Sequence, residues 1–370
     1  MKTTFTIREL RIPLKNPEAL HSGELNEYHM YIIEAQNEAG DKGYGELLSI
    51  PDDNPQHQTV NIPAIINCIN GQRTISPYVV TAVNTAIETI GLEYPALRVP
   101  ICGSVTNPDT VKEEVELFAK KGYEWVKVRL FSKMLDDEVE YVRDNIYDVM
   151  NANPNIKFIF DCAKCFTNAA ELRKFEFLLL PNAEYIIDPH RENQYGHKIG
   201  KATVVRDRDM WFAPDFQKQI IANHRNKQQH FAVKQLMLRL PKHGALLGAE
   251  KMIHSANSYA MEPLFGSGIA GDITCLNEML VYQRKNLPMP GMMDGFLKQK
   301  HRIVRGTQLK HSRNYALFEG GKVDIDWDAI KNKVIDETPK GEPVYMLISE
   351  KVVVNESEDA LKLREYPRLW

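Results

Sequence analysis

The chain has 370 residues, of which 43% are hydrophobic and 26% are charged, a composition typical of a globular protein with a large core. These proportions exclude intrinsic disorder, a collagen-like repeat and a membrane span. Lysine and arginine number 46 against 49 acidic residues, a formal charge of −3 without a basic stripe, so neither nucleic acid nor a membrane is an expected partner.

Cysteine content and the N-terminal segment bear on the cellular compartment. The sequence has five cysteines, an odd number in a long chain, and Met1–Arg8 lacks the apolar stretch of a signal peptide. We therefore expect a cytoplasmic protein with reduced thiols.

The first part of the chain, residues 1–98, is expected to form a small α+β domain. Two segments alternate between apolar and polar residues, as half-buried strands do: Phe5–Ile12 and Tyr28–Ala35. The turn-forming residues Asn37–Gly43 predict a hairpin onto a third strand. Apolar residues then recur at three- and four-residue spacing, which predicts amphipathic helices. The two helices are Val60–Ile69 and Val79–Ile90.

From residue 99 to 319, strand-like and helix-like segments alternate. The strand candidates are Val99–Cys102, Trp125–Leu130, Ile156–Asp161, Tyr185–Asp188, Met210–Asp215, Phe231–Arg239, Tyr259–Leu264 and a short run near Met289. Helical periodicity separates most of them, most clearly at residues 109–120, 136–150, 169–180 and 245–255. Eight strands alternating with helices over roughly 220 residues predict a (β/α)8-type barrel. Residues 320–370 return to strand patterns and are expected to complete the first domain.

Charged residues close most of these strands, and in such a barrel the active site lies at the carboxyl ends of the strands. Lys127 and Arg129 are two positions apart and therefore lie on one face of the second strand. Each of the next three strands ends in an aspartate, and the sixth ends in an arginine. These residues are Asp161, Asp188, Asp215 and Arg239.

Three carboxylates at one barrel mouth suit a hard divalent cation such as Mg2+. Such an ion can hold a substrate carboxylate and stabilise an enolate. In the alternative interpretation, the three aspartates cap loops or begin helices, as aspartate often does.

Five segments carry motifs that occur in the same order in one family of barrel enzymes. Gly122–Arg129 resembles a Lys-x-Lys motif on the second strand, and Asp161–Ala170 resembles Asp-x-Asn-x-x-Trp-Thr on the third. Arg239–Ala245 resembles Lys-x-x-x-x-Gly-Gly on the sixth strand. Gly43–Glu46 and Phe265–Gly271 resemble a Gly-x-Gly-Glu hairpin and a glycine-rich turn after the seventh strand. By these motifs the chain resembles the enolase superfamily, in its mandelate racemase and muconate lactonizing branch.

The resemblance implies a (β/α)7β TIM-like barrel under an N-terminal α+β capping domain, with a Mg2+ site. It also implies removal of the proton α to the carboxylate of a small-molecule substrate, as in isomerases and lyases. In the family, lysines of strands two and six act as acid and base from opposite faces of the substrate. Lys127 matches the first lysine of the Lys-x-Lys motif, which in the family mainly assists binding of the substrate carboxylate or acts as a neighbour to the base. Loops of the capping domain close over the substrate, so His21 and Glu24 are candidate substrate-binding residues. A homo-oligomer is implied as well.

Departures from the family pattern bear on the chemistry. Arg129 and Arg239 stand where the family has lysines, and a guanidinium with a pKa above about 12 does not readily supply the neutral form that a general base requires. Both can still bind a carboxylate or stabilise an oxyanion. The fourth strand presents Ile187 at the position of the family's metal ligand. Its neighbour Asp188 reaches a metal only if the strand end twists, because adjacent residues point to opposite faces.

Three side chains in this region are candidate proton-transfer groups: Lys127, Lys164 and His190. Lys127 needs a lowered pKa for this role, which the neighbouring Arg129 would favour. Lys164 lies in the loop after the third strand. His190 follows the fourth strand and titrates near neutral pH, although a lone histidine in a loop is also typical of surface or packing positions.

Two hypotheses follow. The first is a divergent enolase-superfamily lyase or isomerase that removes the proton α to a carboxylate, with an enolate stabilised by Mg2+ at Asp161, Asp215 and Asp188. The alternative is a catalytically altered or inactive barrel, acting as a metal-free enzyme or as a ligand-binding or structural protein. A salt bridge from Arg129 or Arg239 in the metal position would favour the alternative or a metal-free reaction.

Overall fold

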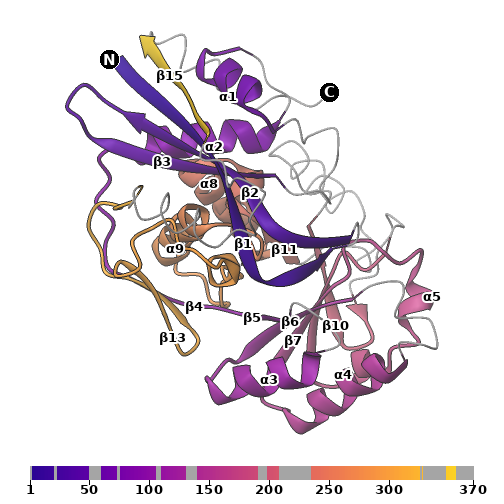
Figure 1. Ribbon diagram of the computed structural model, residues 1–370. Helices are drawn as coiled ribbons and strands as arrows, with labels where there is room; N and C mark the ends of the chain where they lie inside the picture. The colour runs from indigo at the N-terminus through magenta and orange to yellow at the C-terminus, as the bar shows by residue number, and fades with distance from the viewer. Residues whose placement is uncertain are drawn as a thin grey trace.

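The computed structural model describes residues 2–20, 23–49, 60–72, 76–105, 110–130, 140–190, 198–207, 235–325, 327 and 347–355. Figure 1 shows an antiparallel sheet with two helices at one end of the molecule and a curled parallel sheet flanked by helices at the other. Within the described residues, no helix has both the length and the apolar character needed to cross a membrane.

The antiparallel sheet joins the two ends of the chain. Its strand order is β15 (Leu347–Asn355), β1 (Lys2–Leu20), β2 (Gly23–Gln36) and β3 (Lys42–Ser49). The strands expected in the first region are therefore present, and the expected C-terminal strand pairs with β1. Beyond the last residue paired with β3, β1 and β2 continue as a two-stranded hairpin that reaches toward the parallel sheet (Figure 1).

Two helices cover one face of this sheet, as the apolar spacing predicted: α1 (Ile62–Ile69) and α2 (Pro77–Glu88). Asn61 begins α1, and its side-chain Oδ1 accepts a hydrogen bond from the backbone N–H of Ala64 at 2.9 Å. The backbones of α2 and β3 approach so closely that a Cβ on Gly45 would lie 1.8 Å from the carbonyl oxygen of Ala82. Only a glycine fits at this position.

The parallel sheet is curled, and its hydrogen-bonded order is β12-β11-β10-β8-β7-β6-β5. The strands are β5 (Gly103–Val105), β6 (Trp125–Arg129), β7 (Lys157–Asp161), β8 (Ala183–Ile187), β10 (Ala202–Arg206), β11 (Gln235–Leu238) and β12 (Glu262–Phe265). The short β9 (Lys198–Ile199) pairs antiparallel with β10. An α/β fold with a curled parallel sheet of the TIM-barrel type is thereby confirmed.

Residues 291–292, close to the weak strand run expected near Met289, form hydrogen bonds with both edges of this curled sheet. The backbone N–H of Gly291 donates to Pro100 at 2.9 Å, and its carbonyl accepts from Cys102 at 2.9 Å, next to β5. The N–H of Met292 donates to Phe265 of β12 at 2.9 Å. Residues 291–292 thus connect the first and last strands of the order by hydrogen bonds.

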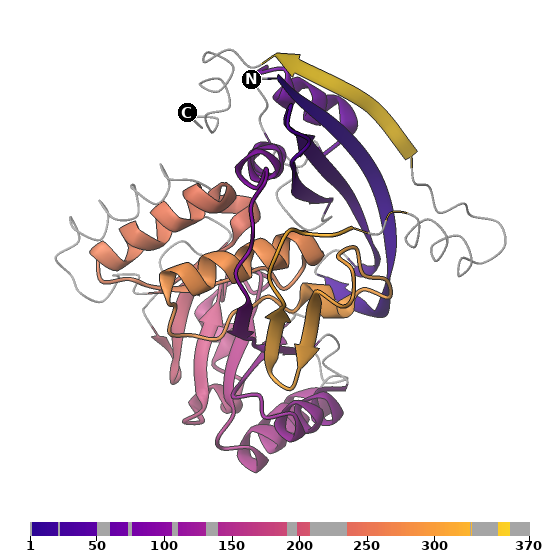
Figure 2. The same ribbon diagram turned by 90° about the vertical axis from the view of Figure 1, so that its left-hand side faces the viewer.

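Helices lie around this sheet, and some of them contact its strands directly (Figure 2). They are α3 (Val111–Lys120), α4 (Glu140–Ala152), α5 (Ala169–Leu172), the 3-10 helix η5 (Glu176–Leu179), α7 (Leu240–His243), α8 (Ala245–Ser258), α9 (Asp272–Lys285) and α10 (Gly295–Lys298). The expected helix at 169–180 is wrong as one helix. The chain is extended at Phe175, between α5 and η5, and this lets Phe175 and Phe177 stack with ring centroids 5.2 Å apart in the core.

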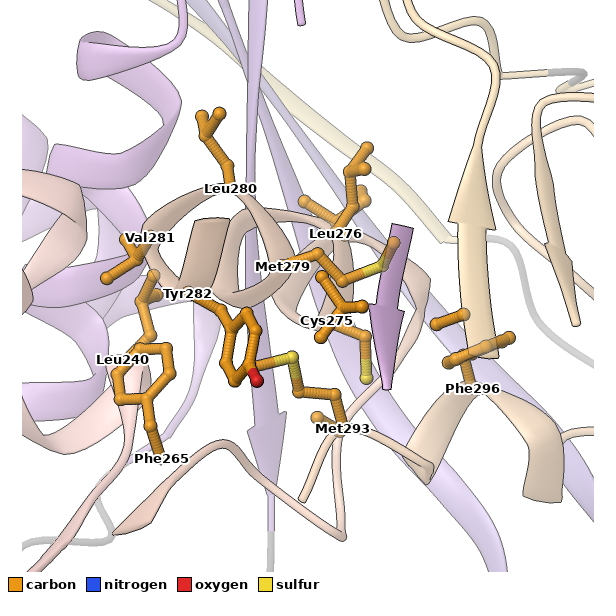
Figure 3. Packing of buried hydrophobic residues seen from close by; sticks show 14 of the residues in the cluster. Leu240, Phe265, Cys275, Leu276, Met279, Leu280, Val281, Tyr282, Met293 and Phe296 are labelled. Carbon is orange, nitrogen blue, oxygen red and sulfur yellow. The ribbon is translucent and has the colours of Figure 1, made fainter. Parts of the chain in front are cut away.

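Helix α9 is the central buried helix. Figure 3 shows its side chains Cys275, Leu276 and Met279 packed among residues of neighbouring loops and helices such as Met293 and Phe296. Almost the whole surface of α9 is buried, so its sequence lacks the one-sided apolar stripe by which the other helices were predicted.

Three strand expectations are corrected. The fifth strand of the sheet is β10, not the run 210–215, which lies outside the described residues. The run 99–102 is split. Its first residues belong to β4 (Leu97–Pro100), which forms a separate antiparallel sheet with β14 (Tyr315–Phe318) and β13 (Leu309–Ser312). Residues 322–325 form a single bridge, Val304 with Ile325, rather than a strand.

Candidate functional site

Alternation along the parallel strands decides which side chains face the inside of the curl. Residues such as Val126, Val128 and Phe160 pack outward against α3 and α4. Their neighbours form a separate inner cluster of Cys102, Trp125, Ile159, Tyr185, Ile187, Val205, Met237, Leu264 and Met292. Side chains two residues beyond these inner positions therefore lie at the mouth of the curl, at the carboxyl ends of the strands.

Lys127 and Arg129 of β6 lie on this inner face, two and four residues after Trp125. Lys127 is buried, and burial lowers its pKa; the charges of Lys298 and Arg129 act in the same direction, while Asp161 opposes them. A Cβ at Gly268 would lie 2.7 Å from the Lys127 Nζ, so the glycine makes room for the ammonium group. The lowered pKa is the condition that a proton-transferring lysine requires.

Asp161 lies beside Arg129, with which it is paired in the register of β6 and β7. The Asp161 carboxylate is 3.8 Å from the Arg129 guanidinium and accepts a hydrogen bond from the N–H of Ala163 at 3.2 Å. Burial alone would raise the pKa of Asp161, but Arg129 and Lys127 outweigh burial and hold it below its ordinary value. The carboxylate is therefore charged and already has a cationic neighbour.

The fourth and fifth strands contribute Asp188 and Asp207, which follow β8 and β10. The Oδ1 of Asp188 accepts a hydrogen bond from the N–H of Asp207 at 3.1 Å. One oxygen of Asp207 pairs with the guanidinium of Arg239, and the other lies 3.2 Å from the Nζ of Lys242 on α7. Lys242 is only 1% exposed. Both carboxylate oxygens of Asp207 are thus held by cations of the chain.

The first antiparallel sheet also contributes to the mouth. Glu18, near the end of the β1–β2 hairpin, lies 2.9 Å from the Nζ of Lys298 and 3.9 Å from Arg129. Burial opposes its ionisation, but Lys298 and Arg129 lower the pKa of Glu18, and the pKa of Lys298 is raised. Lys298 also donates to the carbonyl of Gly268 at 2.7 Å and lies 3.8 Å from Asp294. Lys298 therefore ties the hairpin to the end of the seventh strand.

Glu278 of α9 fixes the turns that follow β11 and β12. Its carboxylate accepts hydrogen bonds from the N–H of Leu240 at 3.1 Å and from the N–H and hydroxyl of Ser267 at 2.8 and 2.7 Å. Leu240 follows Arg239 directly, and Ser267 precedes Gly268. Burial raises the pKa of Glu278 to about 7, against the lowering effect of these hydrogen bonds. One buried carboxyl group thus positions two loops of the mouth.

The structure brings together five of the predicted site residues and adds others. Lys127, Arg129, Asp161 and Arg239 lie in one charged cluster, and Asp188 lies next to it, where its carboxylate accepts a hydrogen bond from the N–H of Asp207. The sequence analysis missed Glu18, Asp207, Lys242, Lys298 and Asp294. Of these, only Asp207 had a local signal, because it closes the apolar pair Val204–Val205.

The remaining predicted residues lie elsewhere or outside the description. Asp215 and His21 are outside the described residues, and Glu24 is exposed on β2. Lys164 is half-buried in the turn after β7, where its N–H donates to the carbonyl of Asp188 at 2.8 Å. His190 is buried and forms a parallel bridge with Phe166. Their roles stay predictions.

A Mg2+ site requires several oxygen ligands that converge on one point. Ile187 points into the apolar inner cluster and offers no oxygen. Asp161 has a cationic neighbour in Arg129, and Asp207 is held by Arg239 and Lys242. Across the described ranges, no three histidine, cysteine, aspartate or glutamate side chains are grouped so as to hold a metal. The described residues therefore do not by themselves provide a three-carboxylate site, and Asp215, the third acid expected from the sequence, lies outside them.

Several solved structures are similar to this chain in fold. An enolase-superfamily protein from Listeria innocua matches with a TM-score of 0.70 and 17% identity, over 89% of this chain and 96% of its own. The fold of the chain is therefore similar to that of an enolase-superfamily protein. The muconate lactonizing enzyme of Pseudomonas putida also has this fold, with a TM-score of 0.70 and 10% identity over 89% of this chain and 98% of its own.

An N-succinyl Arg/Lys racemase from Bacillus cereus is similar in fold over 96% of this chain and 100% of its own, with a TM-score of 0.70 and 15% identity. No protein-family model matches the sequence, and no curated protein matches it significantly. The likeness is therefore one of fold, and the reaction has to be argued from the side chains at the mouth.

Proposed function

We propose that the protein binds a small-molecule carboxylate at the mouth of a (β/α)7β barrel and transfers the proton α to that carboxylate, as an isomerase or lyase. The barrel would comprise residues 99–319, with residues 1–98 and about 320–370 as its capping domain. The observation that carries the proposal is the buried Lys127 on the inner face of β6, whose pKa is lowered next to Arg129.

In this proposal each charged group has a distinct role. Lys127 takes or returns the α proton, because burial and neighbouring cations favour its neutral amine. Arg129 and Arg239 orient the ligand's carboxylate and stabilise the negative charge that develops when the proton leaves. The expected Mg2+-stabilised enolate is not used here, since the described donor set does not fit that ion.

The structural neighbours support the substrate class. Their names include a muconate lactonizing enzyme, an N-succinyl Arg/Lys racemase and an L-Ala-D/L-Glu epimerase, and each name refers to a small molecule with a carboxylate. A homo-oligomer, a cytoplasmic location and the substrate-binding roles of His21 and Glu24 remain predictions.

The test is hydrogen–deuterium exchange at the α carbon, followed by proton NMR in deuterated water. The wild-type chain is incubated with a panel of α-hydroxy acids, N-acyl amino acids and dipeptides. We expect exchange with at least one of them and a loss of about 100-fold or more in Lys127→Met. Lys120→Met, at an exposed lysine of α3, is the matched control and should keep the full rate. Equal rates in Lys127→Met and wild type would refute the role of Lys127.

A second candidate function is a barrel that binds a ligand or partner without catalysis. The ion pairs of Arg239 with Asp207 and of Arg129 with Asp161 favour it, because they leave each acid with a partner from the chain itself. Under this alternative, carboxylates raise the thermal midpoint of the protein but exchange no α proton.

A further inference from the structure

The strand-end positions that should hold a metal carry an unusual set of side chains. Asp161 pairs with Ile187 across β7 and β8, and Val205 of β10 pairs with Ile187 on the other side. Asp207 lies two residues beyond Val205, on the same face. The inner face at these three strands therefore presents an acid, an apolar side chain and an acid.

Asp207 is held by two cations at once. Arg239 lies two positions beyond Met237 on the next strand, and its guanidinium pairs with one oxygen of Asp207. Lys242 reaches the other oxygen from α7 at 3.2 Å, and its side chain is 2% exposed. An ammonium group buried to this degree requires a permanent negative partner, because an unpaired charge in the interior is strongly unfavourable.

On the other side of Ile187, Asp161 also lies beside a cation of the chain, the guanidinium group of Arg129. Their charged groups are 3.8 Å apart, and both side chains are buried or nearly so. A divalent cation between Asp161 and Asp207 would meet Arg129, Arg239 and Lys242 at short range. Repulsion between like charges in a poorly solvated site opposes its binding.

We propose that the mouth works without a divalent cation and that Arg239 and Lys242 supply the positive charge at Asp207 in its place. The guanidinium and ammonium groups neutralise Asp207, keep the mouth assembled in the absence of ligand, and present positive charge to an anionic small molecule. This inference concerns the same site as the proposed function, but its test needs no turnover.

The first experiment measures metal binding by the full chain after treatment with EDTA. Mn2+ is added and free Mn2+ is followed by electron paramagnetic resonance, while melting is compared in about 10 mM MgCl2 and about 10 mM EDTA. We expect no stoichiometric Mn2+ binding and the same melting midpoint in both buffers. One equivalent of tightly bound Mn2+ that is lost in both Asp161→Asn and Asp207→Asn would overturn the inference.

The second experiment measures the coupling of Arg239 to Asp207 by a double-mutant cycle in EDTA. Arg239→Met and Asp207→Asn should each lower the melting midpoint, and the double variant should lose less than the sum of the two, because the Arg239–Asp207 pair is already broken in either single variant; Lys242 lacks its acid in both Asp207→Asn and the double variant. Arg11→Met with Glu27→Gln, an exposed pair of the antiparallel sheet, is the control cycle and should show little coupling. Additive losses at Arg239 and Asp207 would contradict the inference.

These outcomes separate the inference from the proposed function. A chain that binds no Mn2+, shows the coupling and exchanges no α proton retains this inference and loses the proposed reaction. A chain that exchanges the proton only when it binds Mg2+ retains the reaction and loses this inference.

Discussion

Glu278 offers a direct test of how the loops at the mouth are held. It lies on the buried helix α9 and accepts three hydrogen bonds, from the N–H of Leu240 and from the N–H and hydroxyl of Ser267. Replacing it by glutamine keeps its size and one accepting oxygen. The change removes the ionisable group and turns an amide NH2 toward a donor, which costs about 1–3 kcal/mol for the unsatisfied contact.

The pH dependence of this change follows from the pKa of Glu278. The pKa is raised from its ordinary 4.5 to about 7, so between these values the folded protein holds a proton that the unfolded chain has released. The stability from this group is complete below pH 4.5 and is lost as the pH rises through 7. The difference corresponds to about 3 kcal/mol in the free energy of unfolding. Glu278→Gln therefore gains about that amount relative to wild type between pH 4.5 and 8.

The assay is urea unfolding of both proteins at several pH values, followed by tryptophan fluorescence and extrapolated to water. Only the difference between variant and wild type is interpreted, because other carboxyl groups titrate in both. Glu27→Gln, a partly exposed glutamate paired with Arg11, controls for the loss of one negative charge and should follow the wild-type profile. A difference between Glu278→Gln and wild type that stays constant from pH 4.5 to 8 would refute the reasoning.

Three further changes have expected outcomes in thermal or urea unfolding. Lys298→Met leaves Glu18 buried without its closest cation and should lower the free energy of unfolding by about 3–5 kcal/mol. For a chain of this length that is a fall of roughly 4–6 °C in the melting midpoint. An unchanged midpoint would contradict the pairing. Gly45→Ala places a Cβ 1.8 Å from a carbonyl oxygen and should cost at least about 2 kcal/mol, whereas Gly306→Ala, with open space around it, should stay within about 0.5 kcal/mol. Glu46→Gln removes a buried carboxyl group with a pKa raised by burial to about 7, so its stability relative to wild type should also improve as the pH rises from 4.5 to 8, and a flat difference would argue against that pKa.

Several elements of the fold could be predicted from the sequence because their apolar residues form short runs with polar residues at each end. Strands β6 (Trp125–Arg129) and β7 (Lys157–Asp161) lie within a residue of the expected runs, since their apolar residues are buried on both faces and are bounded by polar turns. Strand β10 was missed because it is short and its half-buried positions carry the polar residues Thr203 and Arg206, while the aromatic run at 210–215 gave the stronger strand signal. The error moved the expected fifth-strand acid from Asp207 to Asp215.

Other residues of the mouth had no local signal at all. Glu18 and Lys298 are 280 positions apart, and nothing in either neighbourhood indicates that they meet. Lys242 follows a strand end by four residues on a helix of four residues, where an exposed lysine is the ordinary expectation. Such contacts depend on the tertiary fold, because the long hairpin of β1 and β2 has to reach the parallel sheet before Glu18 has a partner.

The net charge of the whole chain is only −3, because clusters such as the mouth contain cations and acids in equal number. Five cations face five acids there: Lys127, Arg129, Arg239, Lys242 and Lys298 against Glu18, Asp161, Asp188, Asp207 and Asp294. Arg129 lies almost equally far from Glu18 and Asp161, at 3.9 and 3.8 Å, beyond hydrogen-bond range of either. A ligand carboxylate that approaches Arg129 meets the negative charge of Glu18 on the hairpin. The position of that hairpin and the affinity for an anion are therefore linked through one guanidinium group.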